Sequence, residues 1–264
     1  KYYDLNIVSY QWLQFVENKY DFVIVDEVQD LTNAQLYLIL KSLQNSSSFV
    51  LCGDSNQIVH PNFFSWSNVK SMFYKTDMLD NDVRILKTNY RNSPEVTTLA
   101  NTLLKIKHLR FGSVDRESTY LVSSISSKKG EVVYLEDTTK VKQDLNQKTK
   151  SSTRFAVLVM NNTDKAEARK YFQTPLLFSI QEAKGLEYDN IILVNFVSNN
   201  AKEFNEIAAD IEQEDIKQTQ ELNYSRAKDK TDKSLDVYKF YINSLYVAFT
   251  RSVQNLYIVE TNKK

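Results

Sequence analysis

Two short polar segments of this chain carry side chains that could hold a metal ion or activate a water molecule. The first, Asp26-Glu27-Val28-Gln29-Asp30, follows the apolar run 22–25, and the second, Gly53-Asp54-Ser55-Asn56-Gln57, follows the apolar run 49–52. In α/β proteins, ligand sites form at the carboxyl ends of parallel strands. An isolated Asp-Glu pair more often just begins a loop, but two polar segments at neighbouring strand ends indicate one site.

Three later segments add arginines and aromatic rings: Asn89-Tyr90-Arg91, Ala183-Lys184-Gly185-Leu186-Glu187-Tyr188 and Tyr246-Val247-Ala248-Phe249-Thr250-Arg251. Together with the two acidic segments, they resemble motifs II to VI of UvrD/Rep-like superfamily 1 helicases, in the family order. The resemblance covers residues 22 to 251. It implies an α/β chain with RecA-like parallel sheets that forms part of an ATP-dependent DNA helicase or translocase.

The same resemblance assigns roles around ATP and Mg²⁺. Asp26 would hold the Mg²⁺ ion, Glu27 would orient and deprotonate the attacking water, and Gln57 would contact the γ-phosphate or that water. Phosphoryl transfer depends mainly on positioning and on charge stabilisation around a metal-bound triphosphate, so these side-chain types suit the chemistry.

The second half of the chain would complete the nucleotide site. Arg91 and Arg251 would be arginine fingers contributed from the second domain, and Tyr90 would stack on the adenine. Gly185 and Glu187 would approach the nucleotide. Each arginine alone is more simply explained as a surface ion-pair partner, and only the motif context favours catalysis.

Aromatic residues after Gln57 are candidates for contact with single-stranded DNA. His60, Phe63, Phe64 and Trp66 could stack on bases, which grips a strand of any sequence. The alternative is that the phenylalanines are core residues and that Trp66 packs under the helix that follows.

The chain departs from the family at several positions. His60 stands where tyrosine is usual, and Gln181 where histidine is common, so no role is assigned to Gln181. Ser179 replaces a threonine, and we expect it to contact a DNA phosphate. The span between Arg91 and Lys184 is largely needed by the second motor domain, so we expect the accessory domain of UvrD-like enzymes to be lacking or vestigial.

The sequence has no phosphate-binding loop. Such a loop needs clustered glycines and a Gly-Lys-Ser/Thr end, but the 4 glycines of this chain are isolated and none precedes a lysine. We therefore expect the chain to be a piece of a longer protein whose remainder supplies the loop, and to be inactive alone. A degenerate motor is the alternative.

Short apolar runs that alternate with amphipathic stretches predict an α/β fold. Strands are expected at 22–25, 49–52, 83–86, 132–135, 155–160, 176–180, 191–196 and 256–259. Thr32 should cap one helix, and Ser93 with Pro94 should begin another. A polar stretch near residue 80 suggests domains of residues 1–82 and 83–264. The stretch 199–234 is interpreted as an exposed face or a mobile insertion, and the basic residues 105–110 as a solvated helix end, both without function.

Composition limits the protein class. The 264 residues have a formal net charge of 0, so any nucleic-acid site must be a local groove. One cysteine, Cys52, excludes a disulfide within the chain and is expected to be a small buried residue. No run is apolar enough to span a membrane. We expect a cytoplasmic or nucleoid-associated motor, with a non-catalytic nucleic-acid-binding or regulatory module and an RNA motor as the alternatives.

Overall fold

The computed structural model describes residues 4–59, 64–72, 83–113, 115–226 and 235–261. The chain divides into two compact units, of which the first contains residues 1–84 and 114–118, and the second contains residues 85–113 and 119–264. These units differ from the predicted domains 1–82 and 83–264 chiefly in that residues 115–118 are grouped with the first unit. The assignment of the units as motor domains stays a prediction.

The first unit is built on two parallel strands. Strand β1 (Val23–Val25) pairs in parallel with β2 (Phe49–Leu51), and Val23 lies opposite Phe49. Helices α1 (Leu5–Trp12), α2 (Asn33–Lys41) and α3 (Trp66–Met72) complete the unit, together with the 3-10 turns η1 (Val28–Asp30) and η2 (Ser55–Gln57). Thr32 caps α2 as predicted, in a reciprocal capping box with Gln35.

Only one face of this small sheet is covered within the described part of the chain. Val25 and Leu51 contribute to a core with Leu36 and Leu40 of α2, whereas Ile24 remains 69% exposed. Cys52 is exposed, so its prediction as a buried residue is wrong. Side chains alternate along a strand, and Cys52 continues the phase of the exposed Val50, not that of Leu51.

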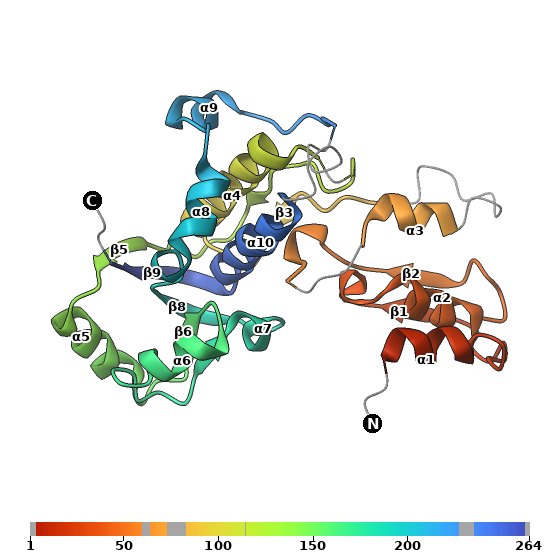
Figure 1. Ribbon diagram of the computed structural model, residues 1–264, viewed down its shortest axis with the longest axis horizontal. Coiled ribbons are helices and arrows are strands. Elements are labelled where there is room, and N and C mark those ends of the chain that lie inside the picture. The colour runs from red at the N-terminus through yellow and green to blue at the C-terminus, as the bar shows by residue number, and fades with distance from the viewer. Residues whose placement is uncertain (1–3, 60–63, 73–82, 114, 227–234, 262–264) are drawn as a thin grey trace. The chain divides into compact units, whose positions relative to one another are not determined.

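The second unit contains a five-stranded parallel sheet in the order β5-β9-β8-β6-β7, of which Figure 1 labels β5, β9, β8 and β6. The strands are β5 (Val132–Glu136), β6 (Phe155–Val159), β7 (Leu177–Ser179), β8 (Tyr188–Val194) and β9 (Ser252–Glu260). Each overlaps a predicted strand, and the predicted α/β class with parallel sheets is confirmed. Most residues of β6 and β8 are buried whichever face of the sheet they occupy, which explains the continuous apolar sequence of these strands.

Helices cover both faces of this sheet (Figure 1). Leu145 of α5 (Thr139–Thr149) and Ala168 of α6 (Asn162–Ala168) pack with sheet residues in one core. Helices α4 (Pro94–Phe111), α8 (Ala201–Ala208) and α10 (Asp236–Thr250) form a second cluster, to which Phe111 and Ile207 contribute. The remaining short elements are β3 (Thr88–Asn89), β4 (Ser123–Ser124), α7 (Ile180–Ala183), η4 (Ser198–Asn200) and α9 (Gln213–Gln218). Strands β3 and β4 pair with each other in parallel as a separate two-stranded sheet.

Three sequence-based expectations for residues 83 to 234 need correction. Residues 83–86 form no strand, because the ladder begins only where Thr88 pairs with Ser123, and Leu86 is 81% exposed. The stretch 199–234 is not solvated throughout, since Ile207 is a core residue. Lys107 is buried against α10, where its ammonium donates to Asn243 Oδ1 at 2.7 Å, so it is not part of a solvated helix end. The expected start of α4 is confirmed, with Ser93 as the cap and Pro94 as its first residue.

Candidate functional site

The predicted water-activating and metal-binding carboxylates follow β1 directly. Asp26 is exposed, and its Oδ1 accepts the backbone N–H of Glu27 at 2.9 Å. Glu27 adopts a left-handed backbone conformation with a φ of 52°. A non-glycine residue rarely adopts this conformation, which costs about 1–2 kcal/mol and occurs preferentially at functional sites.

Gln29 connects this acidic turn to the segment that follows β2. Its side chain is fully buried, and its amide group donates to the carboxylate of Glu27 while its Oε1 accepts the backbone N–H of Asp54 at 3.0 Å. Gly53 makes room for this contact, since a Cβ at that position would lie 2.5 Å from Gln29 Oε1. The two polar segments that were predicted to share a site are therefore joined through one buried carboxamide.

The second segment is ordered around Asp54. The Asp54 carboxylate accepts the backbone N–H of Asn56 at 2.8 Å through Oδ1 and the side-chain amide of Gln57 at 3.1 Å through Oδ2. Glu27, Gln29, Asp54 and Gln57 thus form a continuous hydrogen-bonded series at the carboxyl ends of β1 and β2. Such a series can hold a general base and a phosphate-sensing amide in a fixed relation.

The residues present are compatible with a magnesium ion. Mg²⁺ is usually held in proteins by one or two carboxylates together with phosphate oxygens and water. Asp26 is an exposed carboxylate with one oxygen engaged by a backbone N–H, so it retains oxygen lone pairs for such an ion. Within the described residues no larger group of His, Cys, Asp and Glu could hold a metal.

The second unit gathers its predicted nucleotide-site residues at the amino ends of β8 and β9. Arg91 Nε lies 2.6 Å from Glu187 Oε2, and both side chains are about half exposed. Gly185 has a φ of 79°, and a Cβ added there would have no atom within 4 Å, so only its backbone torsion requires glycine. Tyr90 is 75% exposed, so its ring is accessible to a planar ligand.

Arg251 lies in the same region but is turned inward. Its side chain donates to the carbonyl of Leu186 and, within its own helix, to the carbonyl of Val247, at 3.3 Å each. The residue is only 3% exposed. The loop 185–187 therefore engages both arginines, Arg91 through a carboxylate and Arg251 through a backbone carbonyl.

Asn92 holds the backbones of the two arginines together. Its amide group donates to the carbonyls of Thr250 at 3.0 Å and Ser252 at 2.6 Å, which flank Arg251 in the chain. Asn89 donates in turn to Asn92 Oδ1 at 2.7 Å. Sequence reasoning missed both Asn92 and Gln29 as site residues, although each stands in or directly beside a motif that contains predicted site residues.

The predicted nucleic-acid contacts are only partly accessible. His60 and Phe63 lie outside the described residues. Phe64 is 6% exposed and belongs to the core of the first unit. This agrees with the alternative interpretation, in which the phenylalanines are core residues and do not stack on bases. Trp66 is half-buried and meets Phe64 edge to face, with ring centroids 5.4 Å apart. Ser179 is fully buried and caps α7, its hydroxyl lying 3.2 Å from Glu182 Oε2.

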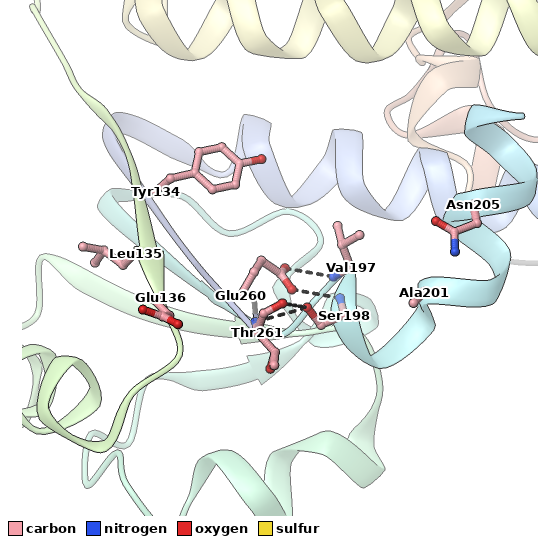
Figure 2. A pocket seen from close by; sticks show the side chains of 9 residues that line it. All are labelled: Tyr134, Leu135, Glu136, Val197, Ser198, Ala201, Asn205, Glu260 and Thr261. Atoms are coloured by element: carbon pink, nitrogen blue, oxygen red, sulfur yellow. Dashed lines mark hydrogen bonds between the residues drawn. The ribbon is translucent and has the colours of Figure 1, made fainter. Parts of the chain in front are cut away.

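A separate cavity of about 490 Å³ lies at the carboxyl ends of β5 and β9 and beside the start of α8 (Figure 2). Glu260 is fixed there, because its carboxylate accepts the backbone N–H groups of Val197 at 2.9 Å and Ser198 at 2.8 Å. None of the predicted site residues lines this cavity.

Among the described residues, no helix is both long and apolar enough to cross a bilayer.

The chain resembles several known proteins over part of their length. It is 26% identical over 270 residues to human TPR and ankyrin repeat-containing protein 1, which covers 90% of this chain and 9% of that protein. It is 32% identical over 91 residues to the ATP-dependent DNA helicase Rep of Buchnera aphidicola, covering 33% of this chain and 14% of that one. The chain thus spans about a tenth of the length of these curated relatives. A solved structure of the PRRSV helicase matches 94% of this chain and 36% of its own, with 12% identity and a TM-score of 0.45.

A family model described as the viral superfamily 1 RNA helicase core domain matches residues 6–206. This match covers well over half of the chain and includes the first four of the five motifs, up to Gly185 and Glu187. The chain therefore belongs to the superfamily 1 helicase core domain family.

Proposed function

We propose that this chain carries the water-activating, charge-stabilising and strand-gripping residues of an ATP-dependent motor that moves along single-stranded DNA, similar to UvrD and Rep. The observation that carries the proposal is the buried link from Glu27 through Gln29 to the segment Asp54–Gln57. This link would let a residue that acts on water and a residue that senses phosphate respond to the same nucleotide.

In this proposal the residues of the first unit act on the attacking water. Glu27 accepts its proton, and its carboxylate is oriented by the Gln29 amide. Asp26 would hold Mg²⁺, which when bound neutralises charge on the phosphate oxygens. Gln57 would donate its amide hydrogens to the water or to a phosphate oxygen.

The residues of the second unit provide positive charge and a ring. Arg91 is half exposed and can exchange its ion pair with Glu187 for a phosphate at low cost, since exposed ion pairs contribute at most about 1 kcal/mol. Tyr90 offers an accessible ring to the base. Arg251 would need to leave its backbone carbonyl partners before it could act as an arginine finger.

DNA is preferred over RNA as the substrate because of the Asp-Glu-x-Gln-Asp form of residues 26–30 and the similarity to Rep. The RNA alternative has its own support, since the matching family model describes viral RNA helicases. Titration of the chain with oligothymidylate and with oligouridylate separates them. Tighter binding of the RNA oligomer would reverse the preference.

A non-catalytic nucleic-acid-binding or regulatory module is the second candidate. The observation in its favour is the burial of Arg251, whose guanidinium is directed at carbonyls of its own unit. A module of this kind would retain strand binding without turnover.

The deciding experiment joins this chain to the phosphate-binding loop that we propose its parent protein supplies. ATP hydrolysis is measured with and without single-stranded DNA, and Glu27→Gln is compared with wild type. We expect DNA-stimulated turnover that falls by two or more orders of magnitude in Glu27→Gln, while nucleotide binding is retained, because Glu27 acts on water and not on the nucleotide. Equal turnover in both proteins would remove Glu27 from the mechanism, and strand binding without any turnover would support the non-catalytic module.

A further inference from the structure

A short segment of the chain, residues 115–118, holds the amino-terminal end of helix α3. We call these residues the strap. The strap packs within the first unit, although Ser113 before it and Thr119 after it belong to the second. It follows α4 in sequence, far from the residues of α3 that it contacts.

Asp115 is the main contact of the strap. It is 1% exposed, and its Oδ2 accepts the backbone N–H of Trp66 at 3.0 Å. Its Oδ1 accepts the backbone N–H of Ser118 at 2.8 Å. Burial of a carboxylate is costly unless hydrogen bonds compensate it, so this geometry holds Trp66 and Asp115 together closely.

A second contact fixes the next turn of the helix. Lys70, one turn beyond Trp66, places its ammonium 2.6 Å from Glu117 Oε1, and the Glu117 side chain is only 13% exposed. Ser65 supplies a local cap, since its hydroxyl oxygen accepts the backbone N–H of Asn68 at 3.1 Å. The first two turns of α3 are thus held from both the strap and the preceding residue.

Trp66 is contacted through both its backbone and its ring. Its backbone is anchored by Asp115, and its ring meets Phe64 at an interplanar angle of 80°. Trp66 also packs against the core of the first unit, but unlike Phe64 it is not fully buried. An aromatic ring held in one orientation loses less entropy when a base stacks on it than a mobile ring does.

We infer that Asp115 is a positioning residue that orients Trp66 for stacking on a base of a single strand. The inference rests on the proposed function, in which this chain grips single-stranded nucleic acid. It assigns a role to a residue outside the motifs, and it selects Trp66 over Phe64 as the stacking aromatic of the described residues.

The test uses the chain in a Trp12→Phe background, so that Trp66 is its one tryptophan. Affinity is measured by the fluorescence anisotropy of a labelled oligothymidylate of about 16 nucleotides, at the upper end of single-strand site sizes. Quenching of Trp66 emission by the unlabelled oligomer reports stacking directly. Thermal melting of each variant checks the fold.

We expect Asp115→Ala to weaken binding about tenfold, within the range of one lost stacking contact, and to reduce the quenching of Trp66. Asp115→Asn keeps one oxygen acceptor, which can serve the Trp66 N–H only if the Ser118 N–H loses its own acceptor. This variant should therefore recover part of the affinity, and more than Asp115→Ala. In a Trp66→Ala background, Asp115→Ala should cause no further loss. Asp137→Ala is the matched control, since Asp137 is a similarly buried carboxylate that accepts from Asn195 and pairs with Lys142 in the second unit.

The outcomes separate the inference from the proposed function. The inference is wrong, and the proposed function stands, if wild type binds the oligomer and Asp115→Ala binds it equally well. The same holds if Asp115→Ala weakens binding by the same factor in the presence of Trp66 and in the Trp66→Ala background. If wild type does not bind, strand gripping and the inference both fail. If Asp115→Ala unfolds below the assay temperature, Asp115→Asn is compared instead, with Trp66 present and in the Trp66→Ala background. A loss of affinity, smaller than that for Asp115→Ala, is then expected only where Trp66 is present.

Discussion

Replacement of Gly53 by alanine should disrupt the link between the two acidic segments. The new Cβ would lie 2.5 Å from Gln29 Oε1 and 2.7 Å from Val28 Cγ1, and both atoms are in buried side chains that cannot move freely. Overpacking of this kind costs about 1–3 kcal/mol. Displacement of the Gln29 oxygen would also leave the Asp54 N–H without its acceptor, at about 1–3 kcal/mol. We expect the free energy of unfolding of the first unit to fall by about 2–4 kcal/mol, since the two costs overlap.

Urea unfolding followed by tryptophan fluorescence measures this unit selectively, because both tryptophans, Trp12 and Trp66, belong to it. The double variant Gln29→Ala, Gly53→Ala should lose less than the sum of the single variants, since the shortened side chain removes the collision. A Gly53→Ala midpoint equal to that of wild type would show that the Gln29 link does not confine this backbone.

Three further predictions concern the second unit. Arg251→Ala should lower the free energy of unfolding by about 1–3 kcal/mol, because the guanidinium hydrogen bonds to the carbonyls of Leu186 and Val247 are lost, and circular dichroism in urea would detect the change. Glu187→Gln should change the free energy of unfolding by less than about 1 kcal/mol, because its ion pair with Arg91 is half exposed. A loss of stability as large as that of Arg251→Ala would contradict this prediction. The Lys165 ammonium holds the pKa of Glu182 below its ordinary value, so Glu182 stabilises the fold above its unfolded-state pKa and ceases to do so as the pH falls through its folded-state pKa. Glu182→Gln should remove this part of the acid sensitivity, and an unchanged pH profile of the melting temperature would refute it.

Local sequence patterns predicted the elements whose signals are local. Thr32 and Ser93 cap helices where expected, because capping depends on residues within one turn. Buried strands such as β6 and β8 were also recognisable from continuous apolar runs. The run 83–86 looks similar in composition but has no partner strand among the described residues, and strand formation requires one.

Burial and positioning were less predictable because they depend on distant residues. Cys52 and Lys107 were assigned the wrong environments, since a strand or helix does not show which of its faces will be covered. Gln29, Asn92 and Asp115 each have a near partner in the chain, but the contacts that give them their positioning roles are to residues 25, 160 and 49 positions away. A motif can therefore identify a reacting side chain, but the residues that orient it are found only in the folded structure.

The contrast between Arg91 and Arg251 separates the motor from the non-catalytic module. Arg91 can reach a phosphate by giving up one half-exposed ion pair, whereas Arg251 must leave two backbone carbonyls inside the second unit. If the chain serves a motor, Arg91→Gln should reduce turnover of the loop-containing protein without changing stability, and Arg251→Lys should reduce turnover more than it changes stability. If Arg251 only supports the fold, its variants should lose stability and turnover in proportion. The chain alone should hydrolyse no ATP in either case, because none of these residues replaces the backbone amides and lysine that fix the β- and γ-phosphates.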